Sequence, residues 1–262
     1  MAPKASATGS ARSPAPKRAR SGKGQPRIDA QPVLILHQYA YRETSRLLDI
    51  FSRDHGRLTV VARGAQRPGS QLRGVLMAFQ PLLLSWFGGG EVKTLHAADW
   101  QGGLTQPVGL PLLCGFYINE LLMRLLPRED PHPHLFAAYF DAVRQLSVLP
   151  ADSGPQVEPV LRGFELSLLQ LLGYGLNFTH ESGGAPIVIG RHYAFVGGQG
   201  FFAANADQGR FDGEVLLALA EGQLSSERVL AQAKLLMRQA LANVLGDIPL
   251  HTRQLLLDLQ RL

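Results

Sequence analysis

Cysteine is nearly missing from this chain, which holds a single one, Cys114, among 262 residues. One cysteine excludes an internal disulfide framework and a cysteine-based zinc site. Cys114 stands in an apolar run, where a small core residue is favoured over the alternative of a catalytic thiol. We therefore expect a protein without cofactor or metal.

Long hydrophobic runs are missing as well. No apolar stretch approaches the ~20 residues that a membrane-spanning helix needs, so we expect no membrane association. The basic start is not followed by the apolar segment of a secretory signal. Its acid-free, Arg- and Ser-rich composition also suits a mitochondrial transit peptide, but Pro14 and Pro16 disfavour the amphipathic helix of such a peptide. The sequence favours a cytoplasmic protein.

The common motifs of enzymes are also lacking. There is no G-x-x-x-x-G-K-[ST] phosphate loop, and Ser21-Gly22-Lys23-Gly24 has neither its spacing nor its final hydroxyl. There is no G-x-S-x-G nucleophile motif. Four histidines stand in expected loops without the spacing of a metal-binding helix, so loop histidines are favoured over the alternative of a metal hydrolase; they are His132, His134, His180 and His192. We expect a protein that is not an enzyme.

Positive charge is concentrated toward the N-terminus. Residues 1–28 contain seven basic side chains and no acidic one, within a net charge of +5 for the whole chain. Residues 106–262 hold 11 basic against 15 acidic side chains. The segment 1–28 is poor in large apolar residues and is predicted to be a disordered basic extension, either an arm on DNA or a solubilising tail.

Residues 29–105 are predicted to form a five-stranded OB-type β-barrel that binds nucleic acid. The strand candidates are 33–40, 43–51, 56–64, 79–87 and 91–99. Tight turns at Asp54-His55-Gly56 and Gly88-Gly89-Gly90 join two of the pairs. A loop or short helix is expected between the third and the fourth strand.

Residues 106–262 are predicted to form a helical partner-binding domain with a small irregular β-like insert, which gives an α+β fold class. Helices are expected at 110–126, 134–149, 158–175, 213–222, 225–245 and 252–261. Pro159 is placed in the first turn of the third helix and Gly173 near its end. The glycine-rich insert spans 180–210.

Arginine clusters between residues 42 and 73, where seven arginines face three acidic residues. On the strand 56–64, the period of two puts Arg57 and Arg63 on one face, opposite Leu58 and Val60. Two guanidinium groups on one barrel face suit a row of phosphates. The alternative is a solvated basic face without a ligand. The predicted nucleic-acid-binding residues are Arg46, Arg57, Arg63, Arg67, Arg73 and Lys93.

Several long motifs, in order along the chain, resemble the bacterial recombination mediator family RecO. They are YRETSRLLDIF (41–51), GRLTVVARGA (56–65), GGGEVKTL (88–95), YINELLMRLL (117–126) and RGFELSLLQLLGYGLNF (162–178). The resemblance runs from about residue 32 to 250. It implies an N-terminal OB barrel followed by a helical domain.

The resemblance also implies a function. Members of the family bind single- and double-stranded DNA, anneal complementary strands and, with RecR and in some settings RecF, help RecA displace single-strand-binding protein. Such a protein works on the nucleoid. Arg57 and Arg63 match the family's DNA-binding face. An architectural or RNA-binding OB protein without mediator activity is the alternative.

Arg162 falls where an arginine of the family helps hold the acidic C-terminal tail of single-strand-binding protein. Such a tail ends in an apolar residue with a free carboxylate and needs a guanidinium beside an apolar slot. The residues expected to line that slot are Leu161, Phe164, Leu168 and Leu169. The alternative is that Arg162 pairs within its own helix, with Glu158 or Glu165.

One region departs from many members of the family. In those members, the part that matches residues 179–205 carries a four-cysteine zinc knot. This chain has no cysteine between residues 179 and 205. The chain therefore resembles the zinc-free branch.

Overall fold

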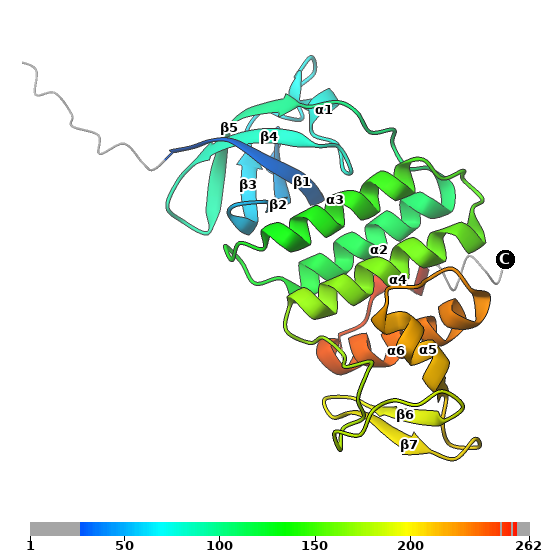
Figure 1. The fold of residues 1–262 in the computed structure, drawn as a ribbon. Helices are drawn as coiled ribbons and strands as arrows, with labels where there is room; N and C mark the ends of the chain where they lie inside the picture. The colour runs from blue at the N-terminus through cyan, green and yellow to red at the C-terminus, as the bar shows by residue number, and fades with distance from the viewer. Residues whose placement is uncertain (1–26, 247, 253, 256–262) are drawn as a thin grey trace, which may run out of the picture.

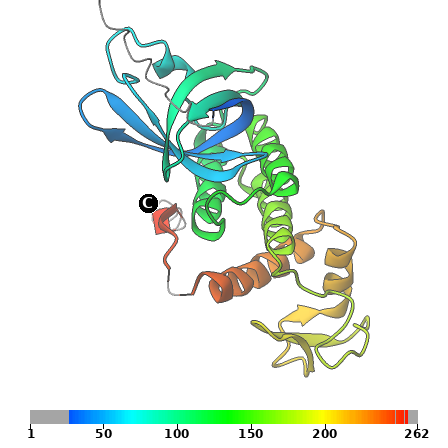
Figure 2. The same ribbon diagram turned by 90° about the vertical axis from the view of Figure 1, so that its left-hand side faces the viewer.

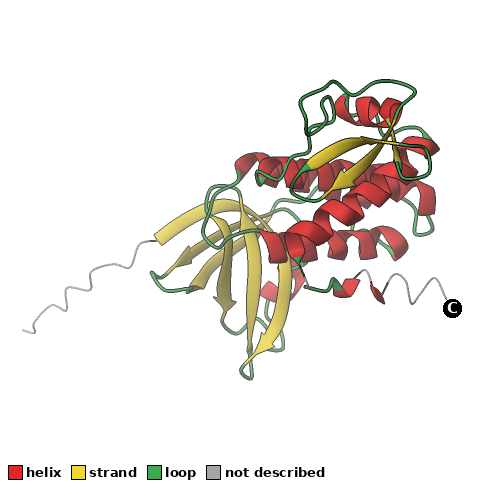
Figure 3. Cartoon of the chain, turned by 90° about the horizontal axis from the view of Figure 1, so that it is seen from below, coloured by secondary structure: helices red, strands yellow, loops and turns green. Residues whose placement is uncertain are grey.

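The computed structural model describes residues 27–246, 248–252 and 254–255. A β-barrel lies at one end, a block of helices lies in the middle, and a small sheet lies at the other end (Figures 1 and 2). The helices separate the two groups of strands (Figure 3). None of the helices in the described ranges is both long and apolar enough to cross a bilayer.

Five strands close the barrel in the order β1-β2-β3-β5-β4, in which β3 and β5 run parallel and the other pairs are antiparallel. The strands are β1 (Arg27–Tyr41), β2 (Ser45–Ser52), β3 (Gly56–Ala62), β4 (Leu82–Phe87) and β5 (Val92–Trp100). A short helix, α1 (Leu72–Val75), connects β3 to β4. The predicted five-stranded barrel is confirmed.

Strand β3 alternates as its sequence predicts. Leu58, Val60 and Ala62 are at most 2% exposed and belong to the barrel core. A strand that covers one core puts every second side chain into it, which is why periodicity alone identified this face.

A β-bulge in β1 changes which residues face the barrel interior. Val33 and Ile35 point into the barrel core, whereas Leu34 and Leu36 pack in the helical core. The register with β2 shifts between Ile35 and His37. Since the extra residue reverses the alternation, the odd-numbered residues after it lie on the outer face.

The helical part consists of α2 (Gly109–Leu125), α3 (Pro133–Ser147), α4 (Gly154–Leu171), α5 (Gly213–Ala220) and α6 (Glu227–Leu245). Its large core also takes Leu34, Leu36 and Phe51 from the barrel. Asn119 of α2 donates a hydrogen bond of 2.9 Å to the Leu36 carbonyl and accepts one from Tyr139. The barrel and the helices therefore share a packed boundary.

The start and end of α4 differ from the prediction. The helix begins at Gly154, so Pro155 stands in its first turn and Pro159 lies inside it. Pro155 offers the preorganised φ that suits a first turn, and the prediction gave this role to the wrong proline. The helix ends at Leu171, where Gly173 takes a φ of +85° and Tyr174 donates to the Leu169 carbonyl.

The expected irregular insert contains a regular three-stranded sheet, ordered β7-β6-β8. Its strands are β6 (His192–Val196), β7 (Gly200–Ala204) and β8 (Phe211–Asp212). Tyr193, Phe201 and Phe211 are buried in the helical core and attach the sheet to it. In the part of the chain that the structure describes, no three His, Cys, Asp or Glu residues gather as a metal site.

The two ends of the chain fall largely outside the described residues. The predicted extension 1–28 lies outside the described residues except for Arg27 and Ile28. These two residues begin β1, so the predicted boundary between the extension and the barrel is corrected from residue 29 to residue 27. Most of the predicted helix 252–261 also lies outside the described residues.

Candidate nucleic-acid interface

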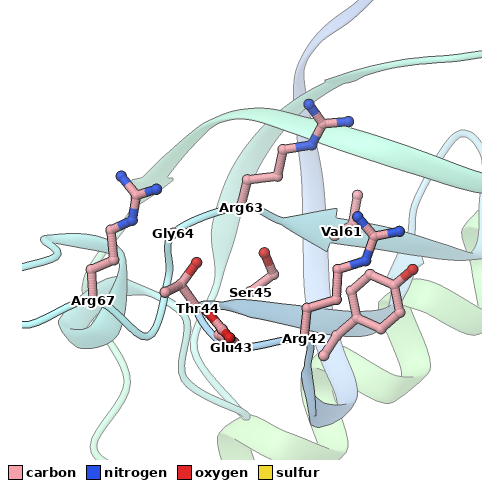
Figure 4. A pocket seen from close by; sticks show the side chains of 9 residues that line it. Arg42, Glu43, Thr44, Ser45, Val61, Arg63, Gly64 and Arg67 are labelled. Atoms are coloured by element: carbon pink, nitrogen blue, oxygen red, sulfur yellow. The ribbon is translucent and has the colours of Figure 1, made fainter.

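A hollow of about 720 Å³ opens at the end of the barrel where the β1–β2 loop meets the exit of β3. Its lining includes three arginines, Arg42 from the loop, Arg63 directly after β3, and Arg67 from the following turn. Figure 4 shows the three side chains projecting to the same side of these loops. All three are exposed to solvent.

Two turns shape the hollow. Arg42 has a φ of +52° and Gly64 a φ of +70°, so both segments reverse sharply there. Gln66 joins the two segments, because its backbone N–H donates to the Thr44 carbonyl (2.9 Å) and its side chain donates to the Ser45 carbonyl (2.9 Å). Gln66 thus holds the β3 exit against the β1–β2 loop.

The charge of the hollow is largely uncompensated. Among the described residues, no carboxylate forms an ion pair with Arg42, Arg63 or Arg67. Glu43 is the one acidic residue in its lining. Three guanidinium groups without carboxylate partners offer charge and fork-shaped donors to an anion such as a phosphate.

Arg57 and Lys93 are not part of this exposed charge, which corrects the sequence prediction. Arg57 is half-buried, and its Nε donates to the Leu126 carbonyl at 3.0 Å. Burial, and then the nearby Arg128, lower its pKa. Lys93 is buried, and its Nζ lies 2.9 Å from Glu129 and 2.8 Å from the Gly90 carbonyl.

The physical reason is a segment far away in the sequence. Residues 126–130, between α2 and α3, lie against β3, and Glu129 donates its backbone N–H to the Arg57 carbonyl at 2.9 Å. A Cβ on Gly56 would lie only 2.1 Å from the Asp130 carbonyl oxygen, so the approach is close. Arg57 and Lys93 therefore bind the helical part of the same chain.

The other two predicted arginines, Arg46 and Arg73, are not part of the lining of the hollow. Arg46 lies on β2, and its guanidinium donates to Gln38 at 3.0 Å. Arg73 is exposed on α1. The predicted set thus contributes Arg63 and Arg67 to the hollow, and it missed Arg42 and Gln66. Arg42 belongs to the same arginine-rich run, which was the available signal for it.

Beside the hollow, a chain of hydrogen bonds crosses the outer face of β1, β2 and β3. The Tyr39 hydroxyl donates to Asp49, the Thr59 hydroxyl donates to Asp49 at 2.6 Å, and Arg128 donates to Thr59 at 2.8 Å. Burial, followed by the hydrogen bond to Asp49, raises the pKa of Tyr39 to about 12. This network fixes the tyrosine ring on the barrel surface.

The predicted partner site on α4 looks different from the expectation. Leu161, Phe164, Leu168 and Leu169 are between 0% and 7% exposed and belong to the helical core, so the expected surface slot is wrong. Their spacing showed an apolar helix face and could not show that other helices cover it.

Arg162 is buried as well, and it forms the intrahelical pair that was the alternative interpretation. Its guanidinium lies 2.9 Å from Glu165 and 4.0 Å from Glu158. Glu165 also accepts a hydrogen bond of 2.7 Å from Tyr117. Burial raises the pKa of Glu165, against the lowering effect of Arg162.

Comparison with known proteins covers nearly the whole chain. The family profile described as "Recombination protein O N terminal" matches residues 30–103, and the one described as "Recombination protein O C terminal" matches residues 109–254. The chain is 49% identical to the DNA repair protein RecO of Azoarcus sp. (strain BH72), over 90% of this chain and 98% of that protein. It is 43% identical to the DNA repair protein RecO of Burkholderia pseudomallei (strain 1710b), over 100% of this chain and 95% of that protein.

Proposed function

Because the chain belongs to the RecO family of DNA repair and recombination proteins, we propose that the hollow at the end of its barrel binds the DNA backbone. The observation that carries this proposal is the set of three exposed arginines, Arg42, Arg63 and Arg67, without carboxylate partners in the described residues. Contacts to phosphates release condensed counterions and so supply affinity that does not depend on sequence. Arg73 is a further exposed arginine, on α1.

The proposed activity is mediation by binding, without chemical turnover. The protein binds single- and double-stranded DNA and anneals complementary strands. An annealing protein has to bring two polyanions together, and its basic surface offsets their repulsion while the base edges stay free to pair. With RecR, and in some settings RecF, it helps to load RecA onto strands coated by single-strand-binding protein. The family membership supports this part of the proposal, which places the protein on the nucleoid in the cytoplasm.

Binding of the single-strand-binding protein tail by Arg162 stays a prediction. In the described structure the guanidinium is occupied by Glu165 and Glu158. A tail carboxylate would have to compete with these two carboxylates, and the helical core would have to open beside Leu161 or Phe164. Tail binding through this arginine thus requires a rearrangement of α4.

Salt dependence of DNA affinity tests the proposed hollow. Each phosphate contact that is lost should flatten the log–log salt dependence by about 0.7 for single strands. Arg63→Ala with Arg67→Ala should therefore flatten it by about 1.4. Arg238→Ala, which removes an exposed arginine on α6, is the matched control and should leave the slope unchanged. Equal slopes for all three proteins would show that the hollow does not bind phosphate.

A second measurement tests mediation. Annealing of complementary strands that are precoated with the cognate single-strand-binding protein should proceed without ATP. The rate should fall in the Arg63→Ala, Arg67→Ala protein and stay at the wild-type level in Arg238→Ala. An architectural or RNA-binding protein would bind the strands without accelerating the annealing of coated ones.

A further inference from the structure

Three aromatic side chains line the outer face of β1 beside the arginine hollow: His37, Tyr39 and Tyr41. The His37 and Tyr39 ring centroids are 4.8 Å apart, with the planes tilted by 45°. Tyr41 lines the hollow itself, and the Arg42 guanidinium lies 5.1 Å from the centre of its ring. The aromatic row therefore continues directly from the basic residues.

The bulge in β1 is what turns these rings outward. Before it, the odd residues Val33 and Ile35 fill the barrel core, and after it His37, paired with Asp49, faces out. His37 and Tyr39 are both exposed to solvent. If β1 alternated regularly through Leu36 instead of bulging, the same aromatic side chains would point into the barrel interior.

The Tyr39 ring is held in place and still open to solvent. Its hydroxyl is bound by Asp49, which is 1% exposed and is fixed in turn by Thr59. The residue nevertheless remains 41% exposed. A ring that is anchored at its hydroxyl and free on its face loses little conformational freedom when a ligand packs on it.

We propose that His37, Tyr39 and Tyr41 form a stacking platform for unpaired bases of single-stranded DNA whose phosphates lie in the Arg42–Arg63–Arg67 hollow. This inference rests on the proposed function, because the hollow positions the strand. Proteins that bind single strands commonly combine a basic groove with aromatic side chains on which bases stack. From His37 to Tyr41 the strand advances by about 13 Å. The row of rings is therefore longer than a single stacked base and has room for more than one.

The platform distinguishes single strands from duplexes. In a duplex both faces of each base are covered by its stacked neighbours, and only the base edges reach the grooves. An unpaired, splayed base has a free face that can pack on a tyrosine or histidine ring. The phosphate hollow serves both forms of DNA, whereas the aromatic row adds affinity for single strands alone.

The test compares Tyr39→Leu with Tyr39→Phe, which keeps the ring. Affinity is measured for a single strand, for the same strand with abasic sites, and for a duplex. Loss of one stacked base corresponds to roughly 5- to 150-fold in affinity. Tyr39→Leu should weaken single-strand binding in this range and leave abasic-strand and duplex binding within twofold. Tyr39→Phe keeps the ring but loses the hydroxyl bond to Asp49, so it should lose less single-strand affinity than Tyr39→Leu. Tyr174→Leu, which removes an exposed tyrosine (52%) outside the barrel, should bind like the wild type.

A second variant keeps the proposal testable if Tyr39→Leu disturbs the barrel, which thermal unfolding would detect. His37→Ser changes only an exposed side chain and should also weaken single-strand binding selectively. Single-strand affinity within twofold of wild type for His37→Ser and for folded Tyr39→Leu would overturn the platform, as would an equal loss on the abasic strand. The salt slope of the Arg63→Ala, Arg67→Ala protein separates the two ideas. A flattened slope with normal aromatic variants retains the hollow and rejects the platform, and an unchanged slope rejects the hollow.

Discussion

Replacing Arg162 by methionine tests whether this buried arginine has a structural role, because it leaves Glu165 without its cationic partner. Glu165 is 1% exposed, and the guanidinium lies 2.9 Å from it. Removing one member of a buried ion pair typically costs about 3–5 kcal/mol, since the remaining charge is uncompensated. In a chain of this size that loss lowers the midpoint of thermal unfolding by roughly 6–20 °C. Methionine keeps most of the volume, so a cavity contributes little.

The loss should depend on pH in a defined direction. Burial already raises the pKa of Glu165 in the folded protein, and Arg162 is the largest influence that lowers it. Without Arg162 the folded-state pKa rises further. A carboxyl group with a raised folded pKa contributes stability below its unfolded pKa, and this stability is lost as pH rises through the folded pKa. Arg162→Met should therefore be close to wild type near pH 4.5 and much less stable at pH 8.

The matched control is Arg162→Met combined with Glu165→Gln, which removes both charges and keeps an acceptor for Tyr117. Its unfolding midpoint should stay close to that of the wild type and should not follow the pH dependence of the single variant. Thermal unfolding by circular dichroism from pH 4.5 to 8 measures all three proteins. An equal loss for the single variant at both ends of this range would refute the buried-pair argument, and no loss at either end would leave Arg162 available for a ligand.

Three further outcomes are expected. Lys93→Ala should leave the salt dependence of DNA affinity unchanged in binding titrations, because Glu129 already neutralises Lys93. A flattened slope would show that Lys93 does contact DNA. Gly56→Ala should lower the free energy of unfolding in urea by about 2 kcal/mol or more, because φ is +66° and the added Cβ would meet Asp130 at 2.1 Å. A neutral result would contradict both the strained φ at residue 56 and the close approach of residues 126–130 to β3. Asn119→Ala leaves two buried groups, the Leu36 carbonyl and the Tyr139 hydroxyl, without their hydrogen-bond partner. It should lower the free energy of unfolding in the same assay by about 1–3 kcal/mol for each of these groups, with DNA affinity unchanged.

The sequence predicted best what depends on local periodicity. The alternation of β3 is visible in seven residues, and the barrel core takes Leu58, Val60 and Ala62 as expected. The glycine beyond α4 was also predictable, because helices commonly end at a glycine in the left-handed conformation that Gly173 adopts. Such patterns were enough to predict that the strands and helices exist. They did not identify the first turn of α4, because both Pro155 and Pro159 could have occupied it.

The candidate site was predicted only in part, because burial of a charged side chain depends on distant residues. Arg57 and Arg63 are equivalent by strand alternation, yet only Arg57 is covered by residues 126–130, about 70 positions away. Likewise, Arg162 stands on a helix whose apolar face could serve a core or a ligand, and neighbouring helices decide between them. The β1 bulge is also invisible in the sequence, so the outward-facing aromatic row was missed.

The packed boundary between the barrel and the helices affects how the protein can be divided. Residues 101–108 form neither helix nor strand, so proteolytic cleavage and truncation of the chain are expected to be easiest at that point. A cut there should not release two independent halves, because Leu34, Leu36 and Phe51 would remain inserted among the helices. The nicked chain should elute as one particle, and a barrel expressed alone should expose those side chains and aggregate. The barrel and the helices are consecutive along the chain, but in the folded protein they share a hydrophobic core and depend on each other for stability.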